Sequence, residues 1–217
     1  MARLGSSKLK SLKENSIRNN VMNRELIRQA TEMLIKGIGE DPNREGIQKT
    51  PARVSEMMVE ILSGYKTDFS EFEGSIFADK FSDMVLVKDI EFYSMCEHHL
   101  VPFFGKAQIA FVPDGKLIGL SKIPRIVDAY AKRLQVQERM TKQIADKLDE
   151  LLSPKGVAVS IEASHLCTMM RGIKKQHSKM VTQSFLGIFR EDEGYMQQFL
   201  MSIGTNLSQD LEIELDF

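Results

Sequence analysis

The chain has 217 residues, of which 42% are hydrophobic and 27% are charged, a composition typical of a soluble globular protein. Its 29 Lys and Arg nearly balance its 30 Asp and Glu, so the overall charge gives no indication of nucleic-acid binding. No apolar run approaches the roughly 18–20 residues that span a membrane, and the N-terminus lacks the apolar core of a secretory signal. Two cysteines are too few for a disulfide framework, so we expect a cytoplasmic protein without membrane contact.

Composition and periodicity divide the chain into four predicted parts. Residues 1–22 are polar and mostly basic, and we expect a flexible arm there. Residues 23–65 show helical spacing, and residues 66–203 contain the strand patterns and form the predicted core domain. Residues 204–217 alternate apolar and acidic side chains and form a predicted tail.

Two helices are predicted in the front part. The first runs from Asn23, a plausible N-cap, to about Lys36, and Gly37 ends it. The second opens with Thr50 as the capping residue and Pro51 at the first helical position, and it should reach about residue 63.

Past residue 80 the apolar period changes from that of a helix to that of a strand. Residues 84–87 and 107–112 read as strands, and a turn at 113–116 should pair residues 116–120 back as a hairpin. Further elements are a helix capped by Ser121 and reaching Leu134, a helix over 137–152, strands over 156–163 and 178–189, and a last helix over 195–203. This order predicts an α+β fold, an antiparallel β-sheet with helices packed on one face.

Five of the six Cys and His residues fall in two short clusters. One is the run from Cys96 to His99, and the other is His165 to Cys167. Cys96, His99 and Cys167 would supply three zinc ligands, and three protein ligands leave a fourth position open, as in catalytic zinc sites. If the strand over 156–163 continues, His165 and Cys167 share one face of it.

The remaining histidines have different interpretations. His98 and His165 lie beside the candidate ligands and could carry protons. His177 lies in a basic turn and is predicted to be a solvated loop residue. The alternative for Cys96 and Cys167 is a pair of buried free thiols, and spacing alone does not decide between the two.

Several charged residues could bind an anion or a base. Lys122 and Arg125 share a face near the start of one predicted helix, where backbone N–H groups favour phosphate oxygens. Arg171 follows the second Cys/His cluster, and Arg53 lies in the first turn of the second helix. The alternative for each is an ordinary exposed charge.

Glu138 begins the helix over 137–152. Its carboxylate could accept two hydrogen bonds from adjacent donors such as those of a guanine edge. Glutamate is also common at helix N-termini because of the helix dipole, and spacing alone favours that reading.

Longer motifs give the chain a specific resemblance. The sequence from about residue 24 to 203 closely resembles GTP cyclohydrolase I of type IA. The resemblance is carried by Thr50–Val54, Ser94–Phe103, Gly119–Lys122 with Arg125, Gln135–Arg139, Gly156–Val159 and His165–Gly172. Two departures are Glu56, where some members carry lysine, and Pro124, where small residues are usual.

The resemblance implies a tunnelling fold and a toroidal homodecamer with active sites at subunit interfaces. It implies conversion of GTP and water to formate and 7,8-dihydroneopterin triphosphate, the first step toward folate or tetrahydrobiopterin, with one Zn²⁺ per subunit. A regulatory partner is also compatible with the family.

The resemblance also assigns roles residue by residue. Cys96, His99 and Cys167 correspond to the zinc ligands, and His98 and His165 to the acid/base pair. Glu138 corresponds to the guanine anchor. Gln137, Leu120 and Ser121 would assist Glu138 in binding the base. The triphosphate contacts would be Lys122, Arg125, Arg171 and Arg53.

Two alternatives belong to other functional classes. A non-catalytic zinc protein that binds nucleotide should lack a proton carrier or the base anchor, and none is missing here. Another tunnelling-fold enzyme acting on a purine or pterin would share the glutamate anchor, but we would not expect the three-ligand set.

Overall fold

The computed structural model describes residues 22–204, so the predicted arm and tail lie almost wholly outside the described residues. The chain divides into two compact units between Thr67 and Asp68. No helix of the described part is both long and apolar enough to cross a bilayer.

The first unit contains the helices α2 (Arg24–Gly37) and α3 (Thr50–Ile61) and a short 3₁₀ turn, η1 (Ser63–Lys66). Asn23 caps α2 as predicted, since its side chain accepts a hydrogen bond from the Leu26 amide at 2.9 Å. The prediction for α3 was wrong by one residue: Lys49 occupies the N-cap position, and no side chain caps this helix. The proline in its first turn needs no amide partner there.

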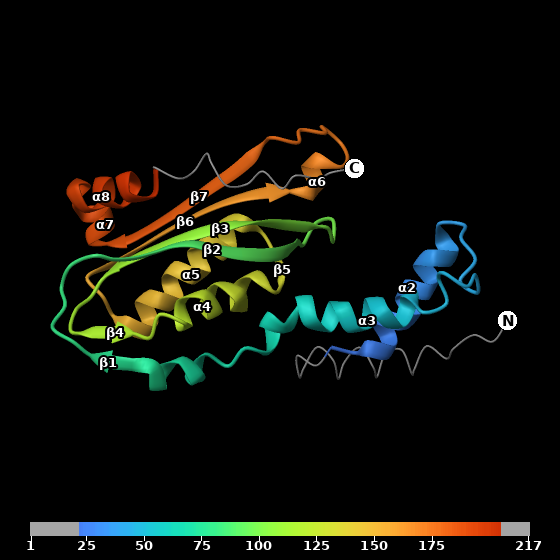
Figure 1. The fold of residues 1–217 in the computed structure, drawn as a ribbon, viewed down its shortest axis with the longest axis horizontal. Coiled ribbons are helices and arrows are strands. Elements are labelled where there is room, and N and C mark those ends of the chain that lie inside the picture. The colour runs from blue at the N-terminus through green and yellow to red at the C-terminus, as the bar shows by residue number, and fades with distance from the viewer. Residues whose placement is uncertain (1–21, 205–217) are drawn as a thin grey trace. The chain divides into compact units, whose positions relative to one another are not determined.

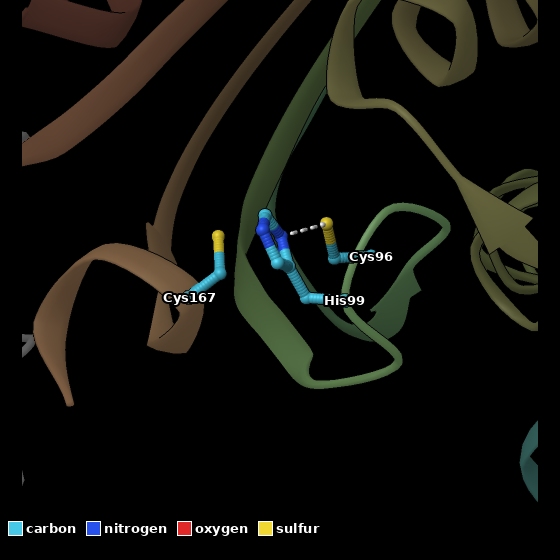
Figure 2. Close-up of side chains that lie close together, drawn as sticks. All are labelled: Cys96, His99 and Cys167. Atoms are coloured by element: carbon cyan, nitrogen blue, oxygen red, sulfur yellow. Dashed lines mark hydrogen bonds between the residues drawn. The ribbon is translucent and has the colours of Figure 1, made fainter. Parts of the chain in front are cut away.

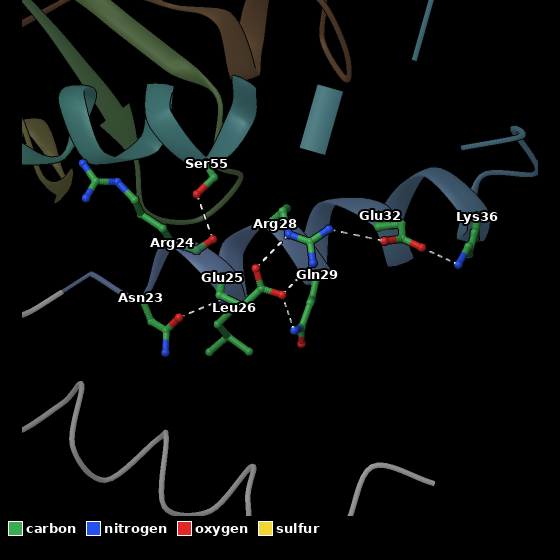
Figure 3. Close-up of polar contacts among 9 residues, drawn as sticks. All are labelled: Asn23, Arg24, Glu25, Leu26, Arg28, Gln29, Glu32, Lys36 and Ser55. Atoms are coloured by element: carbon green, nitrogen blue, oxygen red, sulfur yellow. Dashed lines mark hydrogen bonds and ion pairs between the residues drawn. The ribbon is translucent and has the colours of Figure 1, made fainter. Parts of the chain in front are cut away.

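Polar contacts join the two helices, and others link side chains along α2 (Figure 3). The Ser55 hydroxyl of α3 donates to the Arg24 carbonyl of α2 at 2.8 Å, and the Arg24 guanidinium contacts the Glu56 carboxylate at 3.2 Å. Glu56 therefore has an ion-pair partner within this unit.

The second unit is built on a five-stranded sheet of order β5-β2-β3-β6-β7 (Figure 1). The strands are β2 (Val85–Cys96), β3 (Pro102–Val112), β5 (Leu134–Gln135), β6 (Gly156–His165) and β7 (Lys179–Gly187). All neighbours are antiparallel except β5, which runs parallel to β2.

The two long helices α4 (Lys122–Ala131) and α5 (Gln137–Leu152) cover one face of the sheet, as predicted (Figure 1). Alternate strand residues such as Ile109 and Val159 point to that side and are fully buried in the main core. Two further helices, α7 (Ile188–Glu191) and α8 (Glu193–Gly204), form a second core through Phe189 and Phe199, together with sheet residues of the opposite parity.

The predicted hairpin between residues 107–112 and 116–120 was wrong. Residues Lys116–Ile118 form β4, which pairs with β1 (Ile76–Ala78) in a separate two-stranded sheet, next to the 3₁₀ segment η2 (Phe69–Ser75). The physical reason is that β3 already has β2 on one edge and β6 on the other, so neither edge is free for a third strand.

Three local expectations also need correction. Leu134, predicted as helical, lies in β5 instead. Ser121 stands at the N-cap position of α4, but its side chain makes no capping hydrogen bond. The strand predicted to reach residue 189 ends at Gly187, where a φ of 55° turns the chain into α7.

We expect Gly105→Ala to destabilise the second unit. A Cβ at this position of β3 would lie 1.9 Å from the Glu162 carbonyl oxygen of β6, and backbone cannot move away without disturbing the ladder. Overpacking of this kind should lower the free energy of unfolding by about 2 kcal/mol or more, measured by urea denaturation. Gly74→Ala is the control, because a Cβ added there would have no atom within 4 Å beyond its own chain neighbours and local helix backbone. Equal stability of the two variants would contradict the prediction.

Candidate active site

The first Cys/His cluster occupies the tight connection between β2 and β3. Cys96 is the last residue of β2, and its amide donates to the Val101 carbonyl while its carbonyl accepts from the Leu100 amide, both at 2.9 Å. Leu100 adopts a φ of 52° and is exposed, a conformation that costs a non-glycine residue about 1 kcal/mol. This turn carries His98 and His99 at the end of the sheet.

The second cluster lies at the same end of the sheet but not on one strand. His165 is the last residue of β6, and Cys167 lies in the following short helix α6 (Leu166–Met169). The expectation that both residues share a strand face was therefore wrong. They still reach the first cluster because His165 is paired with Phe103, near the start of β3.

Cys96, His99 and Cys167 converge as predicted (Figure 2). One ligand atom from each lies within 4.8 Å of the others, and Cys96 Sγ is 3.7 Å from His99 Nδ1. Atoms bound tetrahedrally to one ion at about 2.0–2.3 Å lie roughly 3.5–3.8 Å apart, so this group could hold a metal ion after a small closure. Two sulfurs and an imidazole suit zinc in particular.

Burial and neighbouring groups affect the ionisation of the Cys167 thiol. Burial raises the pKa of the Cys167 thiol above its usual range, the neighbouring Cys96 raises it further, and nearby Arg171 offsets part of this. Two thiolates side by side are therefore unfavourable without a cation between them.

Each of the two predicted proton carriers has a distinct environment. His98 is 64% exposed, and its Nε2 lies 3.9 Å from the Glu97 carboxylate. His165 is half-buried, and that burial lowers the pKa of its imidazole, an effect that Glu138 partly opposes.

The start of α5 lies beside this end of the sheet because β5, two residues earlier, pairs with the end of β2. Glu138 is exposed, whereas Gln137 is only 1% exposed and its Oε1 lies 2.7 Å from His165 Nε2. Arg139, next in sequence, contacts the Glu97 carboxylate through both terminal nitrogens, at 2.9 Å for the Nη2–Oε1 pair.

Two contacts of the site were missed by sequence reasoning. The Glu97–Arg139 pair ties the β2–β3 turn to α5 and lowers the pKa of Glu97. The Phe103 ring stacks on His165 with centroids 4.6 Å apart and an angle of 2°. Glu97, Phe103 and Arg139 all fall within the quoted motifs, so the motifs held this signal without assigning a role.

Four predicted substrate contacts lie elsewhere in the second unit. Lys122 begins α4, whereas the opposite end of that helix touches β2, through the Ser94 hydroxyl that donates to the Ala131 carbonyl at 2.7 Å. A helix of 10 residues is about 15 Å long, so Leu120, Ser121 and Lys122 lie roughly a helix length from the metal group, with Arg125 one turn nearer. Leu120, Ser121 and Arg125 are exposed there.

The other two predicted phosphate contacts are placed differently. Arg171 is exposed and lies two residues after the end of α6, four positions after Cys167. Arg53 lies in the first turn of α3 in the other unit and is exposed there.

Comparison with known proteins gives one consistent family. The family model described as GTP cyclohydrolase I matches residues 27–204. The GTP cyclohydrolase 1 of Leptospira biflexa is 54% identical over 175 residues, covering 80% of this chain and 96% of the relative. Those of Chlorobaculum tepidum (49% over 174 residues, 80% and 78% covered) and Pseudomonas aeruginosa (50% over 186 residues, 85% and 100% covered) are similar to a comparable degree.

We expect Cys96→Ser and Cys167→Ser each to abolish tight metal binding, measured as bound zinc after gel filtration. Changes outside the ligand shell already cost about 10–100-fold in affinity, so loss of a ligand should cost more than about 100-fold. His177→Asn, in the exposed loop after Arg171, serves as the control and should keep the wild-type content. Full zinc content in either serine variant would remove that cysteine from the ligand set.

Metal affinity should also rise with pH. The pKa of Cys167 is raised in the metal-free protein, so its thiol keeps its proton near neutral pH and must release it when a metal binds. Competition titrations between about pH 6 and pH 8 should show tighter zinc binding at each higher pH. A flat profile would mean that no thiol loses a proton on binding.

Proposed function

This chain belongs to the GTP cyclohydrolase I family, and we propose that it hydrolyses GTP to formate and 7,8-dihydroneopterin triphosphate with the help of one zinc ion per subunit. The family gives the reaction, and the arrangement of side chains gives the roles proposed here. The observation that carries the assignment of roles is the convergence of the metal group, His165 and the start of α5 at one end of the sheet.

Cys96, His99 and Cys167 would hold the zinc ion. A bound zinc ion would supply a Lewis acid and would lower the pKa of water far enough to make a nucleophile available for the purine C8 near neutral pH. The thiol-rich ligand set and the 3.7 Å separation of Cys96 Sγ and His99 Nδ1 support zinc over a hard cation such as magnesium.

Glu138 would bind the guanine. Its exposed carboxylate can accept hydrogen bonds from N1–H and the exocyclic amine, an arrangement that adenine cannot reproduce. The backbone amide of Gln137, at the first position of α5, has no partner within the helix and can assist.

His98 and His165 would move protons during ring opening and the later rearrangement. The lowered pKa of His165 keeps its ring neutral near pH 7, so it can accept a proton. His98 is exposed and can exchange protons with water. The division of individual steps between the two rings is part of the proposal.

A neighbouring copy of the chain would complete the site. Lys122 and Arg125 suit a triphosphate but lie at the other end of α4 from the metal group, and Leu120 and Ser121 are exposed beside them. A head-to-tail contact between copies can bring that end of one subunit to the metal end of the next. Arg171 would contact the phosphates from the metal side, and Arg53 is a further proposed phosphate contact, within the homodecamer that the family suggests.

The decisive experiment is turnover of GTP by the zinc-loaded protein, followed by release of formate and by fluorescence of the oxidised neopterin product. Glu138→Gln should lower kcat/KM about 10- to 100-fold, because one charge-assisted pair of hydrogen bonds is weakened. Asp149→Asn, an exposed acidic residue in the last turn of α5, is the matched control.

Chelation should abolish product formation and zinc should restore it. Absence of product from an assembled, zinc-loaded protein would overturn the enzymatic proposal and favour a nucleotide-binding protein without turnover. Wild-type activity of Glu138→Gln would remove that carboxylate from base recognition.

A further inference from the structure

The orientation of the Gln137 carboxamide is fixed by its surroundings. Its Nε2 lies 3.0 Å from the Ile161 carbonyl oxygen, 3.0 Å from the Met180 carbonyl oxygen and 3.1 Å from the Thr182 hydroxyl. Carbonyl oxygens only accept hydrogen bonds, so the group that faces them must be the amide nitrogen and not the amide oxygen. The reversed orientation would press an oxygen against two others in a buried place.

This orientation determines where the proton sits on His165. The amide oxygen of Gln137 faces His165 Nε2 at 2.7 Å, and because that oxygen can only accept, Nε2 must carry a hydrogen. The same is true of the neutral and the charged ring. In the neutral ring Nδ1 is therefore the nitrogen with the free lone pair, and the described residues provide no hydrogen-bond partner for it.

The carboxamide itself is held rigidly. Gln137 is 1% exposed, and its main-chain carbonyl accepts from the Thr141 hydroxyl at 2.8 Å. Thr141 is in turn 2.7 Å from the Thr182 hydroxyl, which closes a ring of hydrogen bonds between α5 and β7. On its ring face His165 is fixed by the parallel Phe103 ring.

We propose that Gln137 is the positioning residue of His165: it holds the imidazole in the tautomer with hydrogen on Nε2 and leaves Nδ1 as the nitrogen that exchanges protons with the substrate. The part that concerns the substrate rests on the proposed function. The tautomer itself does not.

This role differs from a direct contact with guanine. The side chain of Gln137 is buried, and both amide hydrogens are directed to protein acceptors, so no donor of that group remains for a ligand. A lost substrate contact would raise KM, whereas a misplaced proton carrier lowers kcat.

The first test is the tautomer in the wild-type protein. With isotope-labelled histidine, NMR shows which ring nitrogen is protonated, because Nε2 is bonded to Cδ2 and Nδ1 is not. The His165 signal is identified by its loss in His165→Ala. We expect a protonated nitrogen that correlates with Cδ2, in protein at a pH where the ring is neutral. A protonated Nδ1 would overturn the proposal without reference to activity.

The second test uses variants of Gln137. Gln137→Met keeps the length of the side chain and removes its polar groups, and it should give a mixture of tautomers and a kcat lowered by roughly 10-fold or more at similar KM, since a well-placed proton-transfer group contributes about 100-fold or more. Gln137→Glu is the conservative variant, because a protonated carboxyl can donate to one carbonyl and accept from His165. It should restore the Nε2–H signal and most of kcat.

Met140→Ala separates positioning from stability. Met140 is fully buried in the same turn of α5 but belongs to the main core, so its truncation destabilises the fold without touching His165. It should lower the Tm while it keeps the tautomer and kcat. Identical behaviour of Gln137→Met and Met140→Ala, or a change confined to KM, would overturn the proposal. Failure of the wild-type protein to process GTP would instead contradict the proposed function.

Discussion

The pairing of β3 with β2 on one edge and β6 on the other is the constraint on which the site depends. The register at this end of the sheet puts Phe103 opposite both Ser94 and His165, so the last residues of β2 and β6 lie at the same end of the sheet. Cys96 and Cys167 therefore lie close together although they are 71 positions apart in the chain. A shift of one residue in either ladder would turn these side chains to the opposite face.

Helix α5 adds the second half of the site through polar contacts instead of apolar packing. Gln137 reaches into the sheet, Glu138 is exposed, and Arg139 contacts the β2–β3 turn through Glu97. These three consecutive side chains point in three different directions, because successive residues of an α-helix are rotated by about 100° around its axis. The rest of α5 is anchored in the core, so these contacts are made from a rigid element.

The sequence predicted those parts of the fold that depend on local periodicity. Helices α2 and α5 follow from amphipathic spacing and end signals such as Asn23, and the metal group follows from the rarity of Cys and His. Contacts set by tertiary pairing were out of reach: β4 pairs with β1 and not with β3, and Gln137 meets Thr182 across 45 positions. Neither choice leaves a trace in residue spacing, because each depends on which edge or surface is already occupied.

The separation of the metal group from the start of α4 has a consequence for how the protein matures. If neighbouring copies complete the site as proposed, a newly folded single chain can acquire its metal before it can grip a triphosphate. Dilution would then separate the copies and stop turnover while the metal stays bound. The activity per subunit would therefore depend on the local concentration of the protein.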